Sequence, residues 1–213
     1  MIVDWLIDYP VFSMHIPQMI NSVQIIDCIK QQYNNSNIRF YISGKNDVIE
    51  EYVPYVAWEG GYVTIRKLDK YEDAISLHFS GCYMAKFEDA IGNKYVSHIH
   101  NGGLHDNKLQ QFLGYCVLKD FRNIVLFKPY YADYPEFIAQ MNGIANHNNL
   151  SAVGIIEDNG NCYSAYILDV VNEPNLKCIC RIIQHMNPLR IGHVINPEQY
   201  HIAENHYHVI YNR

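Results

Sequence analysis

A thiol and two imidazoles lie close together in the sequence between residues 82 and 100. Cys82 ends the stretch Ser76-Leu-His-Phe-Ser80-Gly81-Cys82, and the segment that follows contains His98 and His100. A thiol near neutral pH is mostly protonated, and an adjacent imidazole can remove its proton to leave a thiolate that attacks carbonyl carbons. These residue types favour nucleophilic catalysis, with Cys82 as the nucleophile and a histidine as the base.

The residues must be positioned by a hairpin, which we predict from strands at residues 75–87 and 94–100. In one register His98 lies directly opposite Cys82, with Cβ atoms about 4.5–5.5 Å apart, whereas a slip of one residue turns the two side chains to opposite faces. Alternation in the first register places Ser80 and His100 on the same face as this pair. Gly81 permits a bend with positive φ, and the backbone N–H groups beside it would form an oxyanion hole.

The same residues also allow a non-catalytic interpretation. A buried cysteine is more often a small apolar core residue than a nucleophile. In that case the chain would be an interaction protein, such as an antitoxin, immunity protein or adaptor, with an inert Ser80-Gly81-Cys82. This interpretation predicts a buried Cys82 that resists alkylation. The catalytic one predicts that Cys82 reacts much faster than the other five thiols.

The stretch from Ser76 to Cys82 resembles the active-site motif of the lethal factor 1-like toxins of Burkholderia. These toxins belong to the glutamine deamidase superfamily that includes cytotoxic necrotizing factor and CheD. The family places a threonine six residues before its nucleophilic cysteine, where this chain has Ser76, and a catalytic histidine before an isoleucine, as in His98-Ile99. The stretch Ala57-Trp58-Glu59-Gly60-Gly61, with Thr64 and Leu68 after it, resembles the family's tryptophan-centred segment.

The resemblance covers roughly residues 50 to 104 and includes departures from the family pattern. Phe79 stands where the motif has leucine, Ser76 replaces the threonine, and the interval from Cys82 to His98 is longer than in the lethal factor. That interval is closer to those of the other two groups in the superfamily.

The resemblance implies a protein-glutamine deamidase. Cys82 would attack the carboxamide of a glutamine side chain, His98 would act as acid and base, Ser76 would orient His98, and Ser80 and Gly81 would belong to the oxyanion motif. It further implies a bacterial toxin made in the bacterial cytoplasm and acting in the cytosol of a host cell, with a translation-initiation RNA helicase as one candidate target. Transamidation through the same thioester is the neighbouring reaction. We expect a monomer with no cofactor, no metal and no membrane partner.

A zinc-dependent enzyme is the metal-based alternative. His98 and His100 form an H-x-H pair, and His206 and His208 repeat that spacing near the C-terminus. Alternate residues of a strand share a face, so the four imidazoles could bind zinc if the two strands met. We favour exposed imidazoles for His206 and His208.

Composition and charge exclude several classes of protein. The chain has 213 residues, six cysteines without a C-x-x-C motif, and a net charge of −6. The cysteine spacing supports neither a disulfide scaffold nor a zinc ribbon. The acidic balance argues against a nucleic-acid binder. We recognise no signal peptide, because Asp4 and Asp8 stand where positive charge is needed, and no apolar run long enough to span a membrane.

Hydrophobic periodicity predicts the elements around this motif. Apolar residues at helical spacing indicate a helix over residues 16–33, and further helices are expected at 107–119 and 134–147. Strands are expected at 38–43, 52–58, 61–68, 123–128, 151–157, 162–170, 177–184 and 207–212, with Gly60-Gly61 as a hairpin turn. The order favours one α+β domain over residues 1–213, a mostly antiparallel β-sandwich flanked by helices.

Overall fold

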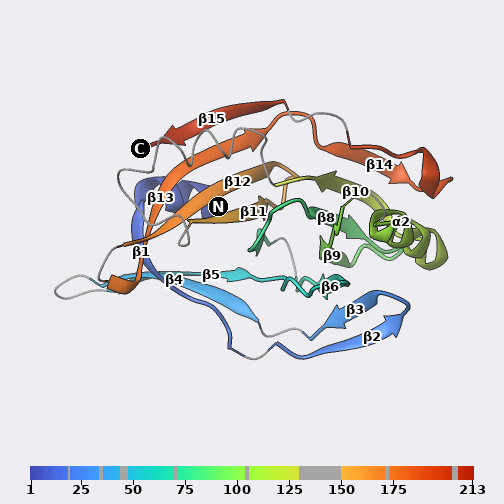
Figure 1. Ribbon diagram of the computed structural model, residues 1–213, viewed down its shortest axis with the longest axis horizontal. Helices are drawn as coiled ribbons and strands as arrows, with labels where there is room; N and C mark the ends of the chain where they lie inside the picture. The colour runs from blue at the N-terminus through green and yellow to red at the C-terminus, as the bar shows by residue number, and fades with distance from the viewer. Residues whose placement is uncertain are drawn as a thin grey trace.

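Two β-sheets pack face to face in the computed structural model, and a helix packs on the other face of each sheet (Figure 1). The structure describes residues 1–18, 20–33, 36–43, 48–69, 72–103, 106–129, 150–170, 173–202 and 206–213. The helices are α1 (Ile2–Asp8) and α2 (Lys108–Lys119), with a short 3-10 turn, η2 (Pro197–Gln199).

The strands are β1 (Val11–His15), β2 (Ser22–Ile26), β3 (Ile29–Gln32), β4 (Asn37–Ser43), β5 (Val48–Pro54), β6 (Val63–Lys67), β7 (Ala74–Ser76), β8 (Tyr83–Glu88), β9 (Lys94–Ile99), β10 (Arg122–Phe127), β11 (Leu150–Ile156), β12 (Cys162–Val170), β13 (Glu173–His185), β14 (Leu189–His193) and β15 (Tyr207–Asn212).

The strands form an eight-stranded sheet, called here the larger sheet, and a seven-stranded smaller sheet. The larger sheet has the order β5-β4-β1-β13-β12-β11-β7, with β15 also paired to β13, and the smaller sheet has the order β14-β10-β8-β9-β6-β3-β2. Among the described strands, β3 and β6 form the parallel pair and the other pairs are antiparallel. The expectation of a largely antiparallel α+β protein is therefore confirmed at this level.

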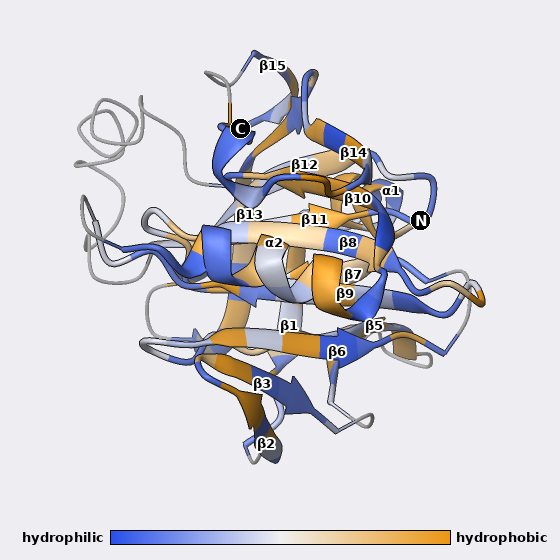
Figure 2. Cartoon of the chain, turned by 90° about the vertical axis from the view of Figure 1, so that its right-hand side faces the viewer, coloured by the Kyte–Doolittle hydropathy of each residue, from blue (hydrophilic) through white to orange (hydrophobic). Residues whose placement is uncertain are grey.

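Alternation along the strands divides the core into three layers. In β12, Tyr166 and Leu168 face the smaller sheet, whereas Ala165 and Ile167 face the side on which α1 packs. Leu109, Phe112, Leu113 and Cys116 form the apolar stripe of α2, at the helical spacing expected of a buried face. Figure 2 shows α2 lying in front of the smaller sheet. The face of β9 that points away from α2 therefore lies between the sheets.

The helix predicted over residues 16–33 is wrong, because this segment forms the hairpin β2–β3. Asp27, with φ of 45°, lies at the turn, and β3 continues the smaller sheet by pairing with β6. The β-branched residues Val23 and Ile25 suit a strand as well as a helix, so pairing with β6 decides the structure. Cys28, expected at the edge of a helical stripe, instead lies between the two strands and donates to the side chain of Gln111.

Two further strand predictions need correction. Gly60-Gly61 is not a hairpin turn, because β5 belongs to the larger sheet and β6 to the smaller one. The predicted strand 75–87 is broken into β7 and β8 by residues 77–82, which also cross between the sheets. The spacing of apolar residues indicates which side of a strand is buried, but it does not show where the chain passes from one sheet to the other.

The other sequence predictions have mixed outcomes. The helix at 107–119 and the strands at 38–43, 61–68, 123–128, 151–157, 162–170, 177–184 and 207–212 are confirmed with small shifts at their ends, and the strand at 52–58 is confirmed over its first residues. The helix predicted at 134–147 lies outside the described residues. In the described part of the chain, no helix combines the length and the apolar character that crossing a membrane requires.

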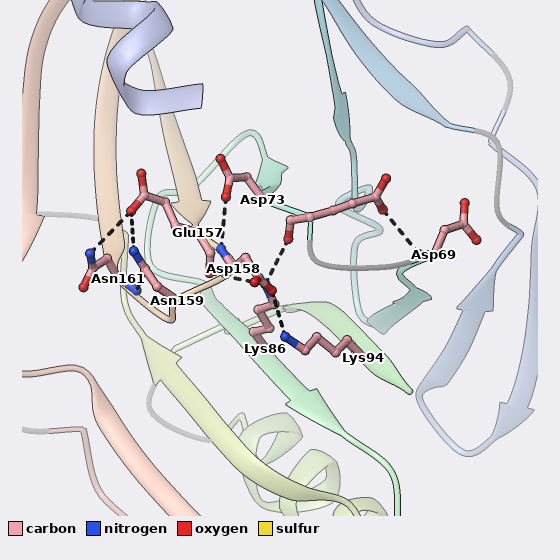
Figure 3. A network of polar contacts seen from close by, with 9 residues as sticks. Asp69, Asp73, Lys86, Lys94, Glu157, Asp158, Asn159 and Asn161 are labelled. Atoms are coloured by element: carbon pink, nitrogen blue, oxygen red, sulfur yellow. Dashed lines mark hydrogen bonds and ion pairs between the residues drawn. The ribbon is translucent and has the colours of Figure 1, made fainter. Parts of the chain in front are cut away.

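A polar network fastens the β8–β9 hairpin to the larger sheet (Figure 3). Nζ of Lys94 lies 2.8 Å from Oδ1 of Asp158, and Nζ of the buried Lys86 lies 3.3 Å from the same oxygen. The backbone N–H of Asp158 donates to Asp73, which precedes β7. This network holds the hairpin that contains His98 against the larger sheet, in which β7 contains Ser76.

Candidate active site

Residues 77–82 carry the chain from the larger sheet to the smaller one and end at the candidate nucleophile. The crossover has two residues with positive φ, His78 at 64° and Gly81 at 152°. Gly81 therefore adopts the bend that the sequence predicted, since a backbone of this kind favours glycine. The side-chain amide of Asn101 donates to the carbonyl of Gly81 at 3.0 Å and fixes the bend against the end of β9.

The register of the β8–β9 hairpin differs from both registers considered for the sequence. Met84, and not Cys82, lies directly opposite His98. The reason is the turn, in which Asp89 accepts hydrogen bonds from the backbone N–H groups of Ile91 and Asn93 and so closes a five-residue tip. Cys82 lies just before β8, outside the paired residues, and packs in the same apolar cluster as Met84.

The side chain of His98 is oriented by Ser76 from the opposite sheet. Oγ of Ser76 lies 2.7 Å from Nδ1 of His98 and donates at 2.6 Å to the carbonyl of Val56. A hydroxyl has one proton to donate, and here Val56 takes it, so Nδ1 of His98 must be the donor to Ser76. His98 is therefore the Nδ1–H tautomer, and its Nε2 has a lone pair to offer.

The environment of His98 keeps the imidazole neutral. Its ring stacks on Phe79 with centroids 4.3 Å apart and 9° between the planes, and its side chain is almost completely buried. Burial lowers the pKa of His98 from its ordinary value to about 3. Nε2 has no hydrogen-bond partner among the described residues. Nε2 of this neutral imidazole therefore offers a lone pair that can accept a proton, although a pKa this low makes the resting imidazole a weak base.

The thiol of Cys82 is buried, with 3% of the residue exposed. Burial raises the pKa of Cys82 above its ordinary value, while hydrogen bonds to the backbone of Asn101 and to the side chain of Trp58 lower it. Those two groups are N–H donors, which stabilise a thiolate more than a thiol. The resting sulfur is therefore protonated, and its reaction requires a base to remove the proton.

The structure separates Ser80 from the rest of the predicted site. Ser80 is exposed, because residues 77–82 are not a strand and strict alternation does not apply to them. The placement of Ser80 on the face of the pair is therefore wrong.

His100 belongs to a different set of contacts from His98. Its Nε2 lies 3.9 Å from Oδ2 of Asp106, and its ring centroid lies 6.2 Å from that of Trp58. Trp58 links this group to Cys82 through its side-chain hydrogen bond to the thiol. The two histidines therefore have separate polar partners, Ser76 for His98 and Asp106 for His100, and neither nitrogen of His98 is hydrogen-bonded to Cys82.

Sequence reasoning missed the contributions of Phe79 and Asn101. The stacking of Phe79 on His98 follows from the crossover, which periodicity does not reveal. Asn101 comes directly after the H-x-H pair, and a polar residue next to a predicted strand end is a weak signal for such a role.

A second set of cysteine, serine and histidine is buried elsewhere in the core. Cys162 is directly opposite His185 across β12 and β13, and Oγ of Ser164 lies 2.7 Å from Nε2 of His185 while donating to the carbonyl of Pro129. All three residues are buried. These side chains repeat the chemistry of Ser76, Cys82 and His98 in another place and provide matched control positions.

The two H-x-H pairs lie on different sheets, with His98 on β9 and His208 on β15. Within the residues that the structure describes, there is no group of three or more histidine, cysteine, aspartate or glutamate side chains that could hold a metal ion. All six cysteines are described, and all six are free thiols.

Comparisons of this chain with protein-family models, with curated proteins and with solved structures find no match.

Proposed function

We propose that this protein is a cysteine-dependent protein-glutamine deamidase. The observation that carries the proposal is the contact between Ser76 and His98, which leaves Nε2 of a neutral imidazole open on the same side of the hairpin as Cys82. Cysteine–histidine hydrolases require a base in this state, with a third residue that fixes its tautomer.

The reaction begins with proton transfer from the Cys82 thiol to Nε2 of His98. The sulfur forms a bond to the carboxamide carbon of a glutamine side chain, and backbone N–H groups of the Ser80–Cys82 bend hold the oxyanion. The C–N bond then breaks, and the imidazolium gives its proton to the departing ammonia. Water hydrolyses the resulting thioester, which yields glutamate and restores the thiol.

Trp58 and Asn101 assist the first step. Their hydrogen bonds reach the sulfur and favour its anionic form, and this partly offsets the cost of forming a thiolate in a buried position. Because the resting thiol is buried, the substrate glutamine must displace part of its surroundings, and Trp58 is the exposed member of that group.

The motif resemblance extends the proposal to the biological role. We place the chain with the lethal factor 1-like branch of the deamidase superfamily, as a single catalytic domain with the fold of that superfamily. It would be a bacterial toxin acting in the host cytosol on a target protein, and a translation-initiation RNA helicase is one candidate. Replacing a neutral glutamine with a negatively charged glutamate would disable a functional surface of that target.

One observation favours a second candidate function, that of a non-catalytic interaction protein. Cys82 is as buried as ordinary core residues, and burial raises the pKa of its thiol. If Cys82 only fills space, its replacement by alanine will change stability and leave every biochemical activity of the protein unaltered.

A chloromethyl ketone analogue of glutamine distinguishes the two functions, because it alkylates a thiol that binds and attacks a glutamine side chain. We expect peptide mapping to find the label on Cys82 in the wild type and in Cys162→Ala, and we expect His98→Ala to slow the labelling strongly. Labelling that also appears on the partly exposed thiols of Cys28 and Cys178, or that does not depend on His98, would refute the deamidase proposal.

A further inference from the structure

Thr64 is the cross-strand neighbour of His98 on the side away from β8. The two residues are directly opposite each other in the pairing of β6 with β9. Val63 and Ile65, which flank Thr64, pack in the core under α2, so the Thr64 side chain points between the sheets, as His98 does. Directly opposed residues have Cβ atoms about 4.5–5.5 Å apart.

Both side chains present a buried polar atom without a partner. Oγ1 of Thr64 and Nε2 of His98 are inaccessible to solvent and make no hydrogen bond to any residue that the structure describes. Each such atom in a core destabilises the folded protein, and native proteins satisfy the great majority of them through protein groups or ordered water. Two of them on directly opposed residues point to a shared polar ligand.

The backbone that crosses this face does not satisfy Thr64. The carbonyl of Tyr55 accepts hydrogen bonds from Gln32 and Arg66, and the carbonyl of Val56 accepts one from Ser76. These bonds hold the segment that leads to Trp58 in a fixed position. The threonine hydroxyl, which can both donate and accept, is therefore left for a small molecule beside His98.

We propose that Thr64 is a positioning residue whose hydroxyl, together with Nε2 of His98, holds the water that hydrolyses the thioester on Cys82. The inference rests on the proposed deamidase function and assigns a residue to its second half. The water gives a proton to Nε2, its oxygen bonds to the thioester carbon, the C–S bond breaks, and the imidazolium returns the proton to the sulfur.

This role of Thr64 favours hydrolysis over transamidation. A water held between two polar groups is already positioned to attack the thioester, whereas an amine must first displace that water. Without the hydroxyl, water loses this advantage and external amines compete better.

The test uses p-nitrophenyl acetate, which acylates a reactive thiol without need of the natural target. The burst of p-nitrophenolate reports acylation, and the decay of the acetyl-enzyme, followed by intact mass, reports hydrolysis. We expect Thr64→Val to acylate like the wild type and to hydrolyse roughly tenfold more slowly, the effect of losing about 1.4 kcal/mol of hydrogen bonding. Thr64→Ser keeps the hydroxyl and is expected to hydrolyse nearly as fast as the wild type.

Adding glycinamide gives a second measurement that a purely structural role would not change. We expect Thr64→Val, and the smaller Thr64→Ala if valine disturbs folding, to pass a larger share of acetyl groups to the amine. Unchanged hydrolysis and partitioning in both variants would refute the role of Thr64 and leave the deamidase proposal intact. Equal slowing of acylation and hydrolysis would also refute it. A wild type that is never acylated at Cys82 would refute both proposals.

Discussion

Ser76 and His98 lie on different sheets, yet Oγ of Ser76 is 2.7 Å from Nδ1 of His98. The bond therefore joins the two halves of the sandwich as well as setting the tautomer of the histidine. Because Ser76 gives its own proton to Val56, one hydroxyl determines where the proton of His98 resides.

Ser76→Ala should lower both activity and stability. The substitution leaves Nδ1 of His98 and the carbonyl of Val56 without their partner, so we expect a loss of about 1–3 kcal/mol in the free energy of unfolding. Acylation of Cys82 should fall by roughly a hundredfold, because the imidazole loses its fixed tautomer. Urea denaturation and the p-nitrophenolate burst measure the two effects. Ser76→Thr, which keeps the hydroxyl, should restore most of the activity.

Ser164→Ala is the matched control for this loss. Ser164 also bonds to a histidine and donates to a backbone carbonyl, but it does so beside Cys162. We expect a similar loss of stability without loss of acylation at Cys82. If Ser164→Ala and Ser76→Ala reduce acylation equally, the effect of Ser76 is only structural.

Stability should fall in acid because of His98. Burial lowers the pKa of His98 from 6.5 to about 3. Between pH 6.5 and pH 3 this histidine is therefore protonated in the unfolded chain but neutral in the folded protein, so acid favours unfolding. The contribution of His98 to the free energy of unfolding is therefore independent of pH above about pH 6.5. It falls by about 1.4 kcal/mol for each pH unit between pH 6.5 and pH 3. The measurement is the free energy of unfolding against pH for the wild type and for His98→Gln. Parallel curves for the two proteins would contradict the burial of a neutral His98.

Trp58→Phe should slow the alkylation of Cys82. The substitution keeps a ring of similar shape and removes the side-chain hydrogen bond that lowers the pKa of the thiol. We expect the pKa of Cys82 to rise, and its reaction with iodoacetamide near pH 8 to slow by roughly twofold to tenfold, as for the loss of one hydrogen bond. Alkylation of Cys178 in the same sample provides the internal reference. Faster alkylation would show that Trp58 only shields the thiol.

His98→Ala and His100→Ala should have different effects. His98 has the open Nε2 and the serine that orients it, whereas His100 lies beside Asp106 and Trp58. We expect His98→Ala to abolish the p-nitrophenolate burst and His100→Ala to reduce it by no more than about tenfold. The opposite order would transfer the role of base to His100.

The sequence indicates which residues make up the candidate site, but not how they are arranged. The residues Ser76, Cys82 and His98 and the bend at Gly81 could be found from residue types, spacing and the motif resemblance. The register could not, because it depends on how Asp89 closes the turn with Ile91 and Asn93.

Sequence periodicity also could not predict which strands belong to which sheet. Residues 16–33 have apolar positions compatible with a helix, but pairing of β3 with β6 makes them a hairpin. The break between β7 and β8 places Ser76 and Cys82 on different sheets, although they are six residues apart. Long-range pairing of this kind is decided by tertiary contacts rather than by local preference.

The most direct test of the central claim is the conversion of glutamine to glutamate in proteins of a eukaryotic cytosolic extract, read by peptide mass spectrometry. We predict that the wild type and Cys162→Ala convert the same specific glutamine, and that Cys82→Ala and His98→Ala do not. A conversion that persists in Cys82→Ala, or a wild type that converts no glutamine in any protein of the extract, would contradict the assignment of this protein as a deamidase.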